Sequence, residues 1–182
     1  MSNATAVAPR AGQSDVEQSS AYALVVVVAD RPGSVDRVVG HLRRRRANMQ
    51  TLVLGRSEQP EYVRLSVTVN DSEVGVDHLV EQLRKIADVR QVQHFALQQA
   101  LIRELALIRV STAENRVNEI ITLAHQFGAY AIDVTPETLT LEVTGSVDKV
   151  EQLVDLLRKF GIREVAYSGQ VALSRGAVAG EQ

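Results

Sequence analysis

The chain of 182 residues contains no cysteine, which excludes disulfides, thiolate zinc sites, cysteine-bound iron–sulfur clusters and cysteine nucleophiles. Nothing in its composition indicates an oxidising compartment, so we expect a cytoplasmic protein. Long hydrophobic segments are also missing. The longest apolar run, at 23–29, is far shorter than the roughly 20 residues that span a bilayer, and we expect no membrane partner.

Neither sign of charge is in excess, since 20 Lys and Arg oppose 22 Asp and Glu for a net charge of -2. No overall field therefore draws the chain to nucleic acid or to an anionic membrane. The one basic run, Arg43 to Arg46, lies at the end of a predicted helix, where positive charge favours the helix dipole. Aromatic residues make up only 4%, and the strand at 23–29 has none. Because the RNA-recognition fold stacks bases on aromatic residues of its strands, we expect no nucleic-acid partner.

The spacing of apolar residues predicts the order βαββαβ twice. In the first half we expect strands at 23–29, 49–54, 62–69 and 89–95, with helices around 35–42 and 76–83. The second half repeats this pattern with strands at 106–110, 131–134, 139–143 and 164–167, and helices around 117–124 and 150–157. We predict an α+β protein with two ferredoxin-like βαββαβ domains, at 22–98 and 99–176, and tails at 1–21 and 177–182. In such a domain the helices cover one sheet face, and the other face is available for association.

Residues typical of catalysis are sparse. The four histidines, His41, His78, His94 and His125, lie on four separate predicted elements, and none has neighbours at metal-ligand spacing. The chain has no phosphate-binding loop, nucleotide fingerprint or nucleophile elbow. We therefore predict no catalytic residue, no metal site and no enzymatic activity of its own.

The segment with the clearest binding potential is the turn from Asp30 to Ser34, between a buried strand and a helix. Gly33 lets a ligand approach the backbone, and the N–H groups of Gly33, Ser34 and Val35 at the helix start can hold a carboxylate. Asp30 can face an ammonium group, so the turn suits a small zwitterion. The same pattern is also typical of an ordinary turn, in which Ser34 or Asp36 serves the helix start. Spacing alone leaves both interpretations open.

The strand, the turn DRPGSVDRVVGHL at 30–42 and the stretch Asn48-Met49-Gln50-Thr51-Leu52 resemble an ACT domain, an amino-acid-sensing module. The second half carries IRELALIRVS at 102–111, the long stretch 131–162 and VALSRG at 171–176. These are similar, in the same order, to signature stretches of the regulatory small subunit of acetolactate synthase, also called acetohydroxyacid synthase. The resemblance covers residues 22–176 and makes the domain at 22–98 an ACT domain.

This resemblance implies a non-catalytic subunit that binds the acetolactate synthase catalytic subunit and activates it. It also implies feedback inhibition by valine or another branched-chain amino acid. Thiamine diphosphate, Mg²⁺ and FAD are then expected in the catalytic partner, and no cofactor in this chain. The family binds its effector where two ACT domains pair in a homodimer. Matching positions put Asp30, Gly33, Ser34 and Val35 on the turn side of that site, and Asn48 and Met49 on the side of the neighbouring chain.

Four positions depart from the family pattern. The family usually has Asn in place of Asp30, a Gly and an aromatic residue in place of Arg46 and Ala47, and Ile in place of Met49. The adaptable Met49 side chain suits leucine or isoleucine as well as valine. Two alternatives stay open: a stand-alone amino-acid sensor that regulates another protein, and an activator that has lost its effector site. For the contact with the catalytic subunit, the candidates are the open sheet face of the second domain and the VALSRG stretch.

Overall fold

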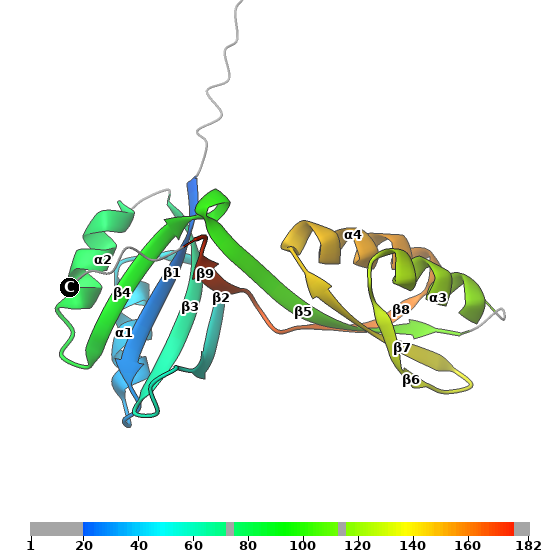
Figure 1. The fold of residues 1–182 in the computed structure, drawn as a ribbon, viewed down its shortest axis with the longest axis horizontal. Helices are drawn as coiled ribbons and strands as arrows, with labels where there is room; N and C mark the ends of the chain where they lie inside the picture. Colours follow the sequence, from blue (N-terminus) through cyan, green and yellow to red (C-terminus); the bar gives the residue numbers. More distant parts are fainter. Residues whose placement is uncertain (1–19, 72–74, 113–115, 177–182) are drawn as a thin grey trace, which may run out of the picture.

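The computed structural model describes residues 20–71, 75–112 and 116–176, which form two domains joined by one long strand (Figure 1). The elements of the first domain are β1 (Ser20–Ala29), α1 (Ser34–Arg44), β2 (Asn48–Arg56), β3 (Tyr62–Asp71), α2 (Val76–Arg84) and β4 (Val89–Ala96). Those of the second are η1 (Leu97–Gln99), β5 (Ala100–Ser111), α3 (Val117–Gln126), β6 (Tyr130–Val134), β7 (Thr138–Gly145), α4 (Val147–Leu157), η3 (Arg158–Phe160), β8 (Ile162–Tyr167) and β9 (Val171–Ser174).

Both domains have the ferredoxin-like strand order. The first sheet runs β2-β3-β1-β4 and the second β6-β7-β5-β8, with every neighbouring pair antiparallel. The predicted α+β class with two βαββαβ domains is therefore confirmed. In each domain the first and third strands lie in the centre of the sheet, and the second strand forms an edge.

The apolar run of β1 occupies the middle of the first sheet, and all six residues of 23–28 are buried. Leu24, Val26 and Val28 point to the helices and share a core with Val38 and Leu42 of α1. Full burial of an aliphatic side chain stabilises a fold by roughly 1.5–3 kcal/mol, so this strand is a main source of stability. The second core is built in the same way from β5, β7, α3 and α4.

Ala23 and Val25 point to the opposite sheet face, and the chain itself covers them. The first four residues of β5 pair antiparallel with β9, although α3 to β8 lie between the two strands in the sequence. This two-stranded unit, Ala100–Arg103 with Val171–Ser174, is called the β5–β9 hairpin below. It lies on the first sheet through Ala172 and Ile102. The predictions had no strand at 171–174, began β5 at Ala106 and left this sheet face open for a partner. The structure corrects these points because the hairpin buries small apolar side chains there.

Two hydrogen bonds attach the hairpin to β3. Thr68 Oγ1 donates to Gln170 Oε1 at 2.9 Å, and Arg64 Nη2 donates to the carbonyl of Ala172 at 3.0 Å. The long β5 then continues as the central strand of the second sheet, where Glu104 to Ser111 pair with β7 (Figure 1). One strand thus belongs to both domains.

The chain ends differ partly from expectation. Ser20 and Ala21, predicted to belong to a tail at 1–21, extend β1 and pair with Asp71 and Asn70. The rest of that tail and the segment 177–182 lie outside the described residues. Among the residues described, no helix has the length and apolar character needed to cross a membrane.

Candidate functional site

The predicted binding turn follows β1 directly. The Asp30 N–H donates to the Glu61 carbonyl at 2.8 Å, which fixes the turn to the β2–β3 connection. Gly33 has φ +81°, a left-handed conformation that favours glycine, and a Cβ there would lie 3.3 Å from Arg37 Nη1. The structure therefore requires glycine at this position.

Ser34 is fully buried, with 0% of its surface exposed. Its N–H donates to the Arg31 carbonyl at 3.1 Å, and its hydroxyl accepts from Arg37 Nη2 at 3.3 Å. The expectation that the Ser34 amide is free for a carboxylate is wrong, because the turn closes on that amide. Gly33 and Val35 stay available, since the first amides of a helix have no intrahelical acceptor.

The remaining predicted residues lie at the other end of the same sheet. Asn48 of β2 pairs with Asn70 of β3, and Asn70 pairs in turn with Ala21 of β1. Ala21 lies nine residues before Asp30, which follows the other end of β1. At about 3.3 Å per residue the two groups are roughly 30 Å apart. A single chain therefore does not bring Asp30 and Gly33 together with Asn48 and Met49.

Asn48 is exposed at the start of β2, and its Oδ1 accepts from Gln50 Nε2 at 3.3 Å. Met49 is half-buried and packs against the first core. β2 is an edge strand, which pairs with β3 on one side and has no partner on the other among the described residues. On this edge Leu52 is 40% exposed. The effector role of all six residues stays a prediction.

The segment before Asn48 contains a strained residue that sequence reasoning missed. Arg46 has φ +53°, the one non-glycine residue with positive φ in the described parts of the chain. The Arg46 N–H donates to the Arg43 carbonyl at 3.0 Å and the Ala47 N–H to the Leu42 carbonyl at 3.1 Å. These two bonds form a Schellman motif, whose left-handed position is usually glycine.

The histidines form no metal site. Among the residues placed by the structure there is no group of three or more His, Asp or Glu that could hold a metal ion. His94 Nε2 lies 3.2 Å from Asp77 Oδ1, an ion pair when the imidazole is protonated. Burial, and then the charges of Arg44 and Arg45, lower the pKa of His41, whose Nε2 is buried without a partner.

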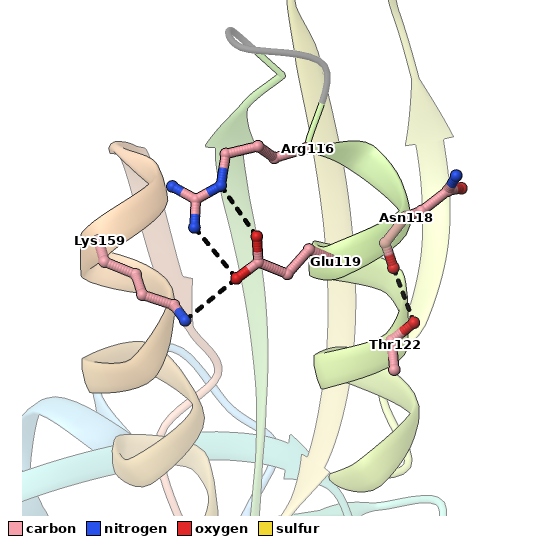
Figure 2. A network of polar contacts seen from close by, with 5 residues as sticks. All are labelled: Arg116, Asn118, Glu119, Thr122 and Lys159. Atoms are coloured by element: carbon pink, nitrogen blue, oxygen red, sulfur yellow. Dashed lines mark hydrogen bonds and ion pairs between the residues drawn. The ribbon is translucent and has the colours of Figure 1, made fainter.

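A polar network on the second domain was also missed (Figure 2). Glu119 accepts from Arg116 Nε at 2.9 Å, from Arg116 Nη2 at 3.0 Å and from Lys159 Nζ at 3.2 Å. The Arg116 and Lys159 cations lie 4.4 Å and 4.8 Å from the centre of the Phe160 ring. The hydrogen bonds from Arg116, and then from Lys159, lower the pKa of Glu119. Glu119 offsets both cations, and the network ties the start of α3 to η3.

Comparison with known proteins gives two matching family models. The model "Small subunit of acetolactate synthase" matches residues 103–176, and the ACT domain model matches residues 30–92. The acetolactate synthase small subunit of Mycobacterium bovis is 37% identical over 155 residues, which cover 85% of this chain and 92% of that protein. The chain belongs to the acetolactate synthase small subunit family. A relative from Archaeoglobus fulgidus, named as a probable member, is 35% identical over 155 residues, 85% of this chain and 97% of its own.

A solved structure supports the same membership of the small subunit family. The crystal structure of the acetolactate synthase small subunit from Thermotoga maritima matches with a TM-score of 0.80 and 29% identity. It covers 87% of this chain and 99% of that chain. The match to the ACT domain model includes the Gly33 turn and Asn48, and the match to the small subunit model includes β9.

Proposed function

We propose that this chain is the non-catalytic regulatory subunit of acetolactate synthase. It binds the catalytic subunit, raises its activity and makes it sensitive to valine or another branched-chain amino acid. The observation that carries the proposal is family membership over 85% of the chain together with the left-handed Gly33 turn at the end of β1. Thiamine diphosphate, Mg²⁺ and FAD belong to the catalytic partner in this proposal.

The effector site forms between two copies of the chain. If two β2 edges pair antiparallel around a two-fold axis, Asn48 of one copy lies beside Arg56 of the other. Arg56 pairs with Val63, which pairs with Val28, so this end of β2 is also the end that carries Asp30. The pairing thus brings both halves of the predicted site together. The exposed Leu52, at the midpoint of β2, supports this interface.

The chemistry of the assembled site suits an amino acid. The amides of Gly33 and Val35 lie at the positive end of the α1 dipole and hold the effector carboxylate. The Asp30 carboxylate faces the ammonium group, and Asn48 of the neighbouring copy adds a polar contact. Ser34 acts indirectly, because its buried amide and hydroxyl fix the turn.

Inhibition follows from thermodynamic linkage. An effector shifts the catalytic subunit only by as much as its affinity differs between the more active and less active arrangements. A coupling of about 1–3 kcal/mol is typical, which corresponds to about 5-fold to 150-fold. The pocket therefore needs only a modest difference in affinity to control the partner.

The test uses the full chain together with its catalytic subunit. We expect co-purification, higher acetolactate synthase activity in the complex, and saturable heat on titration with valine, leucine or isoleucine. Gly33→Asp fills the turn and should abolish effector binding while activation persists. Gly128→Asp is the control, because Gly128 also has positive φ, at +59°, but lies in the second domain.

The outcomes separate the alternatives. Undiminished effector binding by Gly33→Asp places the site elsewhere. Effector binding without association or activation favours a stand-alone sensor. Activation without heat from any of the three amino acids favours an activator whose effector site is lost.

A further inference from the structure

A cavity of about 460 Å³ lies between the first sheet and the β5–β9 hairpin. One wall is made by β2 and β3, and the other by the hairpin that leads into the second domain. The lining residues are Val53, Gly55, Arg56, Arg64, Ser66, Leu101, Arg103, Val171, Ala172 and Leu173. This volume is in the range of about 300–1,000 Å³ typical of small-molecule sites, which are frequent at domain junctions.

Three of the lining residues are arginines, Arg56, Arg64 and Arg103. No carboxylate of the described residues forms an ion pair with any of them. Arg64 interacts electrostatically with Glu58, but the pKa of Glu58 is lowered first by its own backbone amide, then by Ser57, and only last by Arg64. The positive charge in the cavity is therefore not neutralised by an ion pair.

Two of these arginines are held in place. Arg64 donates to the Ala172 carbonyl at 3.0 Å across the gap between the sheet and the hairpin. Arg103 donates from Nη1 to the Ile102 carbonyl at 2.7 Å. Each guanidinium has five donors, so both retain N–H groups for a ligand. Prior positioning also reduces the entropy that binding costs.

The rest of the lining is mostly apolar. Val53 comes from the sheet, and Leu101, Val171 and Leu173 come from the hairpin. Val171 and Leu173 are 51% and 58% exposed, although Ala172 between them is buried. Their exposure gives the cavity an apolar wall beside the arginines.

We propose that this cavity binds a small organic anion with an aliphatic body. Arginine forms paired hydrogen bonds with carboxylates and with phosphates, and the apolar wall takes the hydrocarbon part. Because the two walls come from different parts of the chain, the ligand links β2 and β3 to the hairpin. The site shares none of the six predicted effector residues, although Arg56 also lies on the β2 edge that pairs in the proposed dimer, so the two proposals are tested by separate titrations.

The test is methyl NMR of the full chain, titrated with hexyl phosphate and with hexanoate. We expect saturable shifts at Val53, Leu101, Val171 and Leu173 with at least one of them, and the tighter one identifies the head group. Inorganic phosphate has an anionic head group without the aliphatic body, and hexanamide has the aliphatic body without the charge. Both should bind at least about tenfold more weakly, a difference of about 1.4 kcal/mol.

The variant Arg56→Gln/Arg103→Gln should weaken binding by at least about tenfold, since it removes two charged hydrogen-bond donors from the cavity. Arg64 is left intact because it also holds the hairpin. The control Arg43→Gln/Arg163→Gln removes the same charge from exposed positions outside the cavity and should bind normally.

Three results would overturn the proposal. The first is the absence of methyl shifts at the cavity with either amphipathic probe. The second is equal affinity in the double variant and its control. The third is a shift of the Leu101, Val171 and Leu173 methyls on simple dilution without any probe, which would mean that a second copy of the chain fills the cavity. Val53 is left out because it lies on β2, the strand that pairs in the proposed dimer. A titration with valine follows the resonances of the Gly33 turn instead, so failure of the effector proposal is read separately.

Discussion

Replacing Arg46 with glycine should stabilise the protein. Arg46 has φ +53° at the end of α1, and its amide and that of Ala47 close the helix through carbonyls of Arg43 and Leu42. The same motif ends α3, where Gly128 has φ +59° and Ala129 donates to the Ala124 carbonyl at 2.9 Å. The chain thus contains one such helix end with arginine and one with glycine.

The magnitude follows from two opposing effects. A residue with a Cβ in the left-handed conformation costs about 1–2 kcal/mol. Glycine loses about 0.5–1 kcal/mol more backbone entropy on folding. The centres of these two ranges differ by about 0.75 kcal/mol, so we expect about 0.5–1 kcal/mol in favour of glycine. Arginine near a helix C-terminus contributes a few tenths of a kcal/mol through the dipole, so Arg46→Ala is the proper reference.

The assay is urea denaturation of Arg46→Gly, Arg46→Ala and Gly128→Ala. We expect Arg46→Gly to exceed Arg46→Ala by about 0.5–1 kcal/mol in unfolding free energy, and Gly128→Ala to lose a similar amount. In thermal unfolding, 1 kcal/mol corresponds to about 2–4 °C for a chain of this size. If the domains unfold separately, each variant shifts the transition of its own domain.

Equal stability of Arg46→Gly and Arg46→Ala would mean that Arg46 is not strained in solution, contrary to this prediction. A loss on Gly128→Ala in the same experiment shows that the method detects such strain. A higher unfolding free energy of Arg46→Gly than of Arg46→Ala, together with a lower one for Gly128→Ala, would support strain at Arg46.

Four further predictions concern other regions. Glu104 is 6% exposed, and burial, followed by the charge of Glu151, raises its pKa above the model-peptide value of 4.5. Its ionised form therefore weakens the fold as pH rises through its folded pKa, and Glu104→Gln should raise the midpoint of urea unfolding at neutral pH but not at pH below 4.5. For Glu119, whose pKa is lowered by Arg116, ionisation has the opposite effect on stability. Ionised Glu119 stabilises the fold above pH 4.5, and this stabilisation is lost as pH falls. Glu119→Gln should therefore lower the midpoint of urea unfolding at neutral pH only. Gly169→Ala places a Cβ 2.7 Å from Val53 Cγ2 and should loosen the β5–β9 hairpin, with faster proteolysis near β9, whereas Gly176→Ala has similar φ strain but no atom within 4 Å and should not. Leu52→Lys puts a charge at the midpoint of β2 and should shift a dimer toward monomer in analytical ultracentrifugation, and Leu156→Lys, exposed to a similar 44%, should not.

Most of the fold was predictable because the spacing of apolar residues indicates which side of each strand and helix is buried. The β-branched run of β1 is buried on both faces, and the i, i+3, i+4, i+7 pattern of α1 buries Val38 and Leu42. The β5–β9 hairpin escaped prediction for a physical reason. β9 has four residues, and its exposed side carries Val171 and Leu173, so the usual alternation of polar and apolar residues is absent.

The candidate site was predictable only in part. The position of the turn followed from the sequence, which assigned Gly33 to it as a place where a ligand can approach the backbone. The φ of +81° adds a conformational reason for glycine that spacing does not give. The use of the Ser34 amide depends on how the turn closes onto the Arg31 carbonyl, which spacing does not encode. Likewise, Arg43 to Arg46 was interpreted as a solvated helix end, and the strain at Arg46 appears only when the backbone path into β2 is known.

In the proposed effector site, the separation of Asp30 from Asn48 within one chain would make effector binding and dimer formation two aspects of one equilibrium. If each site takes residues from two chains, the effector binds the dimer and not the monomer, and by mass action it must tighten the dimer. We therefore expect valine, or whichever branched-chain amino acid gives heat in the titration, to lower the dimer dissociation constant measured by analytical ultracentrifugation. Gly33→Asp should abolish this effect, and Gly128→Asp should retain it. Full effector affinity in a chain that stays monomeric, such as Leu52→Lys, would contradict a shared site and would place the whole site within one copy.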